Sequence, residues 1–98
     1  MSLRKFRWSK VYESTEEELT DFLRARNIET THWAAEAFDV LENQSYGTDS
    51  TLWCAEGSLT FRAGDTTMSL QPGDAVRVPA STPFTLQAGI SGYICYKS

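Results

Sequence analysis

Apolar and polar residues alternate along much of the chain, and this pattern predicts a mainly β protein. Residues 3–12 alternate loosely between apolar and basic side chains, which is typical of a half-buried strand. Residues 52–61 and 66–70 alternate again, and Gly64-Asp65 between them suits a tight hairpin turn. Turn signals recur about every 8–12 residues in this part of the chain, which is typical of a β-sandwich or barrel.

Residues 14–26 have the pattern of a short amphipathic helix. Ser14 is a good N-cap, and Glu17 three residues later completes a capping box. Asn27 suits the left-handed conformation that often ends a helix. The apolar stripe of this helix consists of Leu19, Phe22 and Leu23.

Residues 31–43 carry conflicting signals. Their Ala, Glu and Leu residues favour a helix, whereas their position between candidate strands favours an extended segment, and we predict a strand. Further along, Pro72 and Gly73 suit the two central positions of a type II turn, because proline presets the first dihedral and glycine accepts a positive φ. Later strands are expected near residues 76–78, 84–86 and 93–96.

The length of the chain predicts one domain. A chain of 98 residues can bury only one modest core. Hydrophobic residues make up 41% and aromatic residues 12%, which is enough apolar material for a folded globule. We expect a single domain over residues 1–98, with a strand and a helix in 1–27 and a β-barrel in 28–98.

Charge and hydropathy argue against two classes of partner. The net charge is −4, whereas binding to nucleic-acid phosphates requires a surplus of basic residues. No apolar run approaches the roughly 20 residues that span a bilayer, and the first residues lack the apolar centre of a signal peptide. We therefore expect no nucleic-acid partner, no membrane partner and a cytoplasmic location. Cys54 and Cys95 are expected to be buried thiols rather than a disulfide.

Two glycine-containing patterns in the β part of the chain form a recognisable set. Gly73 is followed, after five residues, by Pro79, and Gly57 lies in the run WCAEGSLTF. Over about residues 33–97 the chain resembles the cupin family, whose second motif is G-x5-P-x-G-x2-H-x3-N and whose first is H-x-H-x3–4-E-x6-G. The resemblance implies a double-stranded β-helix, or jelly-roll barrel.

The chain departs from both motifs at the metal ligands. Phe84 stands where the second motif has histidine, and Ser50 stands at the glutamate of the first. Gln44 with Tyr46, or Asn43 with Ser45, occupy the two remaining histidine positions; Ser81 and Ala88 replace the second motif's glycine and asparagine. A cupin site uses three imidazoles and a carboxylate, a set that suits borderline cations. We therefore predict no metal and no cofactor at this site.

Other residues with functional chemistry have ordinary structural interpretations. A single imidazole cannot rebuild a metal site, so we expect His32 at the surface of a strand. Asp74 is expected to accept hydrogen bonds from turn amides, and Trp33 and Trp53 are expected to pack in the core. Most of four carboxylates are expected to face solvent, because unpaired charges are costly to bury, and only one that pointed into the barrel could serve as a general acid or base: Glu36, Asp39, Glu42 and Asp49.

Strand alternation predicts the lining of the barrel. If Ser50 faces inward, then so do Leu52 and Cys54, with Phe84 and Leu86 across the barrel. The interior would hold either a narrow ligand pocket, with Phe84 as an apolar wall, or a plug of side chains. The predicted pocket residues are Gln44, Tyr46, Ser50, Leu52, Cys54, Phe84 and Leu86.

These observations predict a binding or interaction module, metal-free at the usual site, rather than an enzyme, and they identify no catalytic residue. The expected ligand is a small molecule. The alternative is a cupin enzyme of the isomerase, epimerase or dioxygenase type that uses a non-standard site. We also expect a homodimer, because the first strand offers apolar contacts through Phe6, Trp8 and Tyr12.

Overall fold

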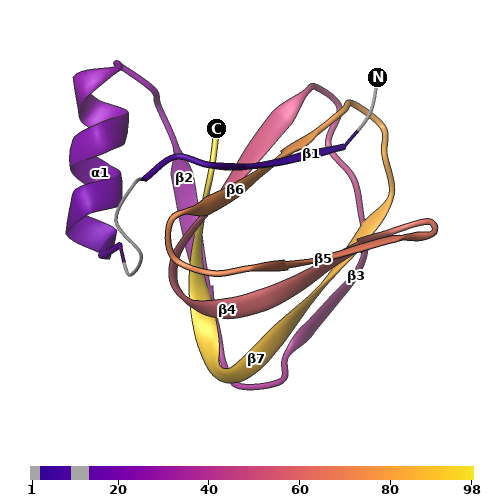
Figure 1. Ribbon diagram of the computed structural model, residues 1–98. Helices are drawn as coiled ribbons and strands as arrows, with labels where there is room; N and C mark the ends of the chain where they lie inside the picture. The colour runs from indigo at the N-terminus through magenta and orange to yellow at the C-terminus, as the bar shows by residue number, and fades with distance from the viewer. Residues whose placement is uncertain (1–2, 10–13) are drawn as a thin grey trace.

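The computed structural model describes residues 3–9 and 14–98, and within them the chain is mainly β with one helix (Figure 1). This confirms the predicted fold class. Every strand pair is antiparallel. The elements are β1 (Arg4–Arg7), α1 (Glu16–Ala25), β2 (Thr31–Ala35), β3 (Val40–Gln44), β4 (Ser50–Ala63), β5 (Thr66–Leu70), β6 (Asp74–Val78) and β7 (Phe84–Lys97).

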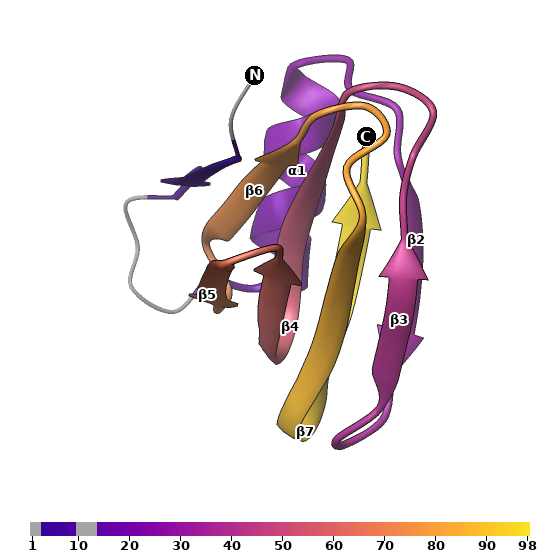
Figure 2. The same ribbon diagram turned by 90° about the vertical axis from the view of Figure 1, so that its right-hand side faces the viewer.

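Two long strands, β4 and β7, form the centre of the barrel. Their first and second halves pair with different neighbours. One end of β4 pairs with β6 and one end of β7 with β2, which gives the order β1-β6-β4-β7-β2. Their other ends pair with β5 and β3, respectively. Each long strand therefore belongs to two sheets that curve around a common interior (Figures 1 and 2).

The bend between the two halves depends on two glycines. The pairing of β4 with β7 is irregular on either side of Gly57. Gly57 has φ 73° and Gly92 has φ 71°, conformations that favour glycine. A Cβ atom on Gly57 would overlap the carbonyl oxygen of Gly92. The two backbones can therefore approach this closely only without a side chain at position 57.

The interior between the two sheets holds the main core. Strand alternation places Leu52 and Cys54 in this core, whereas Trp53 and Ala55 face the opposite side of β4. On that opposite side they pack with Leu19 of α1, so the helix covers the outer face of the sheet. The buried core between the sheets consists of Leu52, Cys54, Leu59, Phe61, Ala63, Leu70, Val76, Val78, Phe84, Leu86, Ala88, Tyr93 and Cys95.

The helix begins one residue later than its capping pattern predicts. Thr15, not Ser14, is the N-cap, and its Oγ1 accepts a hydrogen bond from the Glu18 amide at 3.1 Å. Both residues carry a hydroxyl that can cap a helix, and the extended backbone at Thr15 suits the N-cap position. The predicted stripe is confirmed at Leu19 and Leu23, which are buried. No helix in the described parts of the chain is long and apolar enough to cross a membrane.

The first strand is shorter than predicted. β1 ends at Arg7, and residues 10–13 of the predicted strand, including Tyr12, lie outside the described residues. Phe6 and Trp8, which the sequence suggests as contacts to a partner, are half-buried and pack against the chain's own core. The Phe6 ring meets Trp53 at 5.7 Å between centroids, and the Trp8 ring meets Phe22 of α1 at 5.4 Å.

Residues 31–43 are extended, as predicted, but they form two strands. A turn separates β2 from β3, and in it the Asp39 amide donates to the Glu36 carbonyl at 3.1 Å. Phe38, inside this turn, has φ 62° although it is not glycine. The predicted turn at Pro72 and Gly73 is confirmed: Gly73 has φ 102°, and the Asp74 amide donates to the Gln71 carbonyl at 2.8 Å.

The hairpin predicted at Gly64-Asp65 is also confirmed. It joins β4 to β5, with Ala63 paired directly to Thr66. Gly64 has φ 56° at the first central position of this two-residue turn, where glycine is favoured.

Candidate ligand pocket

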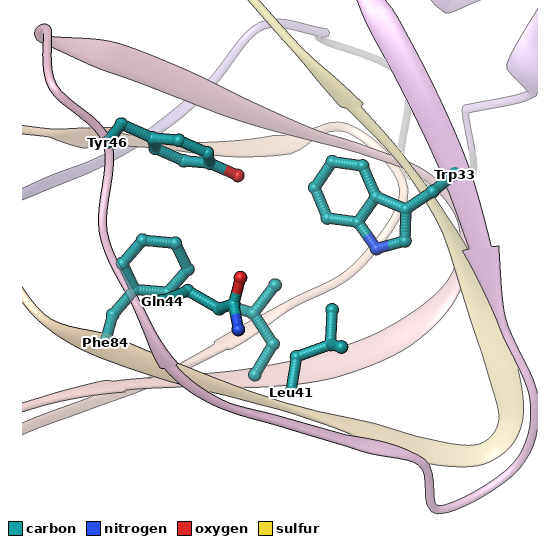
Figure 3. A pocket seen from close by; sticks show the side chains of 6 residues that line it. Trp33, Leu41, Gln44, Tyr46 and Phe84 are labelled. Carbon is teal, nitrogen blue, oxygen red and sulfur yellow. The ribbon is translucent and has the colours of Figure 1, made fainter.

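A pocket of about 210 Å³ lies where β2 and β3 meet the first half of β7 (Figure 3). Phe84 and Leu86 of β7 belong to the buried core and form its inner wall. The residues that line it are Trp33, Leu41, Gln44, Tyr46, Phe84 and Leu86. The pocket therefore extends the barrel interior toward the surface at this side of the molecule.

Aromatic rings hold the walls of the pocket in place. Phe84 is only 2% exposed, stacks on Phe61 at 5.2 Å between ring centroids, and meets the Tyr46 ring at 5.5 Å. Across the pocket, the indole N–H of Trp33 donates to the Tyr93 hydroxyl at 3.2 Å. This hydrogen bond fixes the orientation of the indole, so both aromatic walls are supported by the core behind them.

Two polar groups face the space between these walls (Figure 3). The Tyr46 hydroxyl points into the pocket and makes no hydrogen bond within the described parts of the chain. Burial, with smaller contributions from Cys95 and Tyr93, raises the pKa of Tyr46 to about 12, so this hydroxyl keeps its proton at neutral pH. The Gln44 side-chain N–H donates to the Glu42 carbonyl at 2.9 Å, which leaves the amide oxygen of Gln44 as an acceptor.

Four of the seven predicted pocket residues line this pocket: Gln44, Tyr46, Phe84 and Leu86. The other three do not line it. Leu52 and Cys54 are fully buried in the core, and the Ser50 hydroxyl donates to the Thr48 carbonyl at 3.0 Å. Side chains thus fill the deep part of the barrel, and the open space lies toward β2 and β3.

Sequence reasoning did not assign two of the lining residues to the pocket. Trp33 was assigned to the core, and it packs against the core while also forming a pocket wall. Leu41 is 37% exposed and lies on β3 opposite Leu86. Its role follows from the boundary between β2 and β3, which no glycine or proline marks. Trp53 packs under α1, as a core aromatic.

The backbone at the motif positions agrees with the proposed alignment. Gly57, Gly73 and Ser81 all have positive φ, the last at 61°. Ser81 thus keeps the left-handed conformation that the motif's glycine allows without strain. Of the two alternatives for the first motif, Gln44 with Tyr46 line the pocket beside Phe84.

The carboxylates predicted to face solvent are exposed, which confirms that expectation for Glu36, Asp39, Glu42 and Asp49. Asp39 accepts a hydrogen bond from the Glu36 amide at 3.0 Å, and Asp49 accepts one from the Ala80 amide at 2.8 Å. Residues 3–9 and 14–98 contain no group of three or more His, Cys, Asp or Glu side chains that could hold a metal ion. Two of the four carboxylates, Asp39 and Asp49, therefore accept hydrogen bonds from backbone amides.

His32 and Asp74 have the structural roles that their positions predict. His32 is exposed on β2 and stacks on the Tyr96 ring at 4.9 Å between centroids. Asp74 accepts a hydrogen bond from the Gln71 amide at 3.0 Å. It also pairs with Arg7 at 2.9 Å and Lys5 at 3.8 Å, which ties β1 to the turn before β6.

The two cysteines are buried free thiols, as predicted. Cys54 of β4 lies directly opposite Cys95 of β7. Burial raises the pKa of the Cys54 thiol to about 12 and also raises the pKa of Cys95. Both thiols are therefore protonated at neutral pH and are poor nucleophiles.

Neither a protein-family model nor a curated protein matches this sequence. Among solved structures, the chain is similar to a DUF861 family protein from Thermotoga maritima, at 14% identity and TM-score 0.69, covering 99% of this chain and 98% of that one. It is also similar to a cupin superfamily protein from Desulfitobacterium hafniense, at 10% identity and TM-score 0.65, covering 99% and 76%. The chain has the cupin fold.

A further similar structure is that of an enzyme. Salicylate 1,2-dioxygenase from Pseudoaminobacter salicylatoxidans matches at 15% identity and TM-score 0.59, covering 82% of this chain and 31% of that one. The match to another solved structure covers 64% of the chain of that structure. At these identities the similarities establish the fold alone. The chemistry that the pocket can perform depends on the residues that line it.

Proposed function

We propose that the protein binds a small molecule in the pocket between β2, β3 and β7. The observation that carries this proposal is a space of about 210 Å³ with mostly apolar walls and two polar groups directed into it. Small-molecule sites have this composition, in which apolar walls provide affinity and a few polar groups set orientation.

The lining side chains support binding more than catalysis. Tyr46 is the only ionisable residue among the six that line the pocket, and its pKa of about 12 makes it a poor proton acceptor at neutral pH. An epimerase-type reaction would need a second acid–base group. A dioxygenase-type reaction would need metal ligands, and Gln44 and Tyr46 offer an amide and a protonated phenol. The enzyme alternative therefore has no residue set in this pocket to support it.

A fragment screen with a pocket-filling variant tests this proposal. Small compounds should shift the NMR signals of the Trp33 indole and the Gln44 side-chain amide. Leu41→Trp should abolish these shifts, because the larger side chain occupies the pocket. Val40→Trp is the matched control, since Val40 is the neighbour of Leu41 on β3 and does not line the pocket. Equal binding to both variants, or no binding to the wild type, would refute the proposal.

We predict that the purified protein carries no stoichiometric transition metal. Among the lining residues, an amide and a protonated phenol are weak ligands for iron, manganese, nickel or zinc. Elemental analysis of tag-free protein, after dialysis against a chelator, should find far less than one equivalent of each metal. One retained equivalent would show that the chain supplies ligands that this interpretation misses.

We also propose that the protein forms a homodimer through an exposed apolar surface. Phe38 is 62% exposed and Ile90 is 79% exposed. The Phe38 amide donates to the Gly89 carbonyl at 3.1 Å, which holds the β2–β3 turn beside the bend of β7. Val40, on the adjoining β3, is also an exposed large apolar residue, whereas its neighbour Leu41 faces the pocket. Such a group on one side of a small domain is typical of an interaction site.

Light scattering should give about twice the 11.0 kDa mass of one chain. Ile90→Lys should shift the protein toward the monomer, because a charge would be buried at the contact. Thr67→Lys, an exposed position on β5, should leave the mass unchanged. A wild-type mass near 11.0 kDa at tens of micromolar would contradict the dimer.

We further propose a cytoplasmic location. Cys54 and Cys95 lie opposite each other on paired strands and are free thiols. Free thiols in this position fit a reducing compartment.

A further inference from the structure

We infer that the pocket binds an uncharged molecule with a single ring and one hydroxyl or carbonyl substituent. This inference rests on the proposed function, because it names the class of ligand that the same pocket would select. Four properties of the pocket support it: its volume, its aromatic walls, its lack of charged side chains and its two polar groups.

The volume limits the ligand to about one ring. An apolar cavity of about 150 Å³ in another protein binds benzene. The pocket beside β3, at about 210 Å³, has room for a ring with a small substituent. A second ring would have to extend past Leu41 into solvent, since this side chain is the exposed part of the wall.

The walls favour a flat, unsaturated ring. Figure 3 shows Trp33 on one side of the pocket and Tyr46 with Phe84 on the other. Aromatic pairs prefer offset or edge-to-face arrangements, and such contacts add to the gain from burying apolar area. A ring between these walls can meet one face and one edge at the same time, which a flexible chain cannot do.

The absence of charge selects against ions of both signs. None of the six lining side chains is charged. A carboxylate in the pocket would lose its water without gaining a cationic partner among the lining residues. An ammonium ligand would likewise lose its water without gaining an anionic partner, since none of the six lining side chains is acidic. A neutral ligand avoids both penalties.

The two polar groups complement a hydroxyl. The Tyr46 hydroxyl can donate a hydrogen bond, and the Gln44 amide oxygen can accept one. Both face the space between the aromatic walls (Figure 3). A phenol or benzylic alcohol can satisfy both groups at once, and a ring carbonyl can satisfy Tyr46. A ring with no polar substituent leaves both groups unpaired.

Calorimetric and NMR titrations of the wild-type protein at pH 7 with four matched probes test this inference. The probes are phenol, toluene, benzoate and benzylammonium, which share one ring and differ in polarity and charge. Phenol should bind at least tenfold more tightly than benzoate or benzylammonium, and several-fold more tightly than toluene. In each case the Trp33 indole signal should report binding at this pocket.

Tyr46→Phe separates the hydroxyl from the ring. This variant keeps the contact with Phe84 and removes a hydroxyl that makes no hydrogen bond within the described residues, so it should fold normally. Phenol affinity should fall about two- to tenfold, whereas toluene affinity should stay the same or rise slightly. An equal loss for both probes would overturn the assigned role of the hydroxyl.

The outcomes distinguish this inference from the proposed function. Tighter binding of benzoate or benzylammonium at the Trp33 wall would overturn the inference and leave a small-molecule pocket in place. The same holds if only acyclic compounds from the fragment screen shift the Trp33 and Gln44 signals. If neither the ring probes nor any fragment shifts these signals at millimolar concentration, both the inference and the proposed function fail.

Discussion

Gly57→Ala is expected to lower the free energy of unfolding by about 2–5 kcal/mol, a large share of the roughly 5–15 kcal/mol that stabilises a typical domain. Two effects add. A positive φ costs a non-glycine residue about 1–2 kcal/mol, and Gly57 has φ 73°. The new Cβ would also overlap the Gly92 carbonyl oxygen, and forced crowding of this kind costs about 1–3 kcal/mol. Urea unfolding followed by circular dichroism measures the change.

Two other glycines separate the two effects. Gly64 has φ 56° but no heavy atom within 4 Å of an added Cβ, so Gly64→Ala should cost only about 1–2 kcal/mol. Gly47 has neither a positive φ nor a close neighbour, so Gly47→Ala should be close to neutral. If Gly57→Ala lowered the free energy of unfolding no more than Gly64→Ala does, this result would contradict the close approach of β4 to β7 at Gly92.

Phe84→Ala is expected to lower the free energy of unfolding by about 3–5 kcal/mol, the usual cost of truncating a buried phenylalanine. Phe84 is 2% exposed, and its ring contacts both Phe61 and Tyr46. Removing it would leave a cavity between the core and the pocket. Chemical denaturation again measures the effect, which should appear as a lower midpoint at an unchanged slope.

The control for Phe84→Ala is Ser69→Ala. Ser69 is exposed on β5, away from the proposed dimer surface, so its truncation should change stability by less than about 0.5 kcal/mol. A Phe84→Ala cost near that of Ser69→Ala would mean that the ring lies at an open pocket mouth and does not support the core. Phe84 would then be a replaceable lining residue.

Local patterns in the sequence were sufficient to predict much of the fold. The hairpin at Gly64 and the turn at Gly73 were predicted because glycine and proline impose their conformation through short-range sterics. The helix was placed within two residues at its start, and the remaining error reflects two adjacent hydroxyls at Ser14 and Thr15. The turn between β2 and β3 was missed because its left-handed residue is Phe38, and tertiary contacts rather than local preference hold it there.

The pocket was harder to predict than the turns, because its lining depends more on contacts between residues far apart in the sequence. Gln44, Tyr46, Phe84 and Leu86 could be proposed from the spacing of the cupin motifs, and they do line one space. Trp33 could not be placed there, because its position follows from the pairing of β2 with the far end of β7, where it lies opposite Cys95. Ser50 could not be separated from the pocket for a similar reason, since its inward direction alone does not say whether its side chain reaches this space.

The sharing of β4 and β7 between two sheets has a consequence for how the chain folds. The two strands are joined through β5 and β6, so their pairing closes a long loop and should make folding slow for a chain of this size. Neither sheet has its central strand pair until this step is complete. Trp33 lies beside the pocket and Trp53 lies under α1. We therefore expect the fluorescence of both indoles to change in one concerted transition, with the helix-covered face and the pocket lost together.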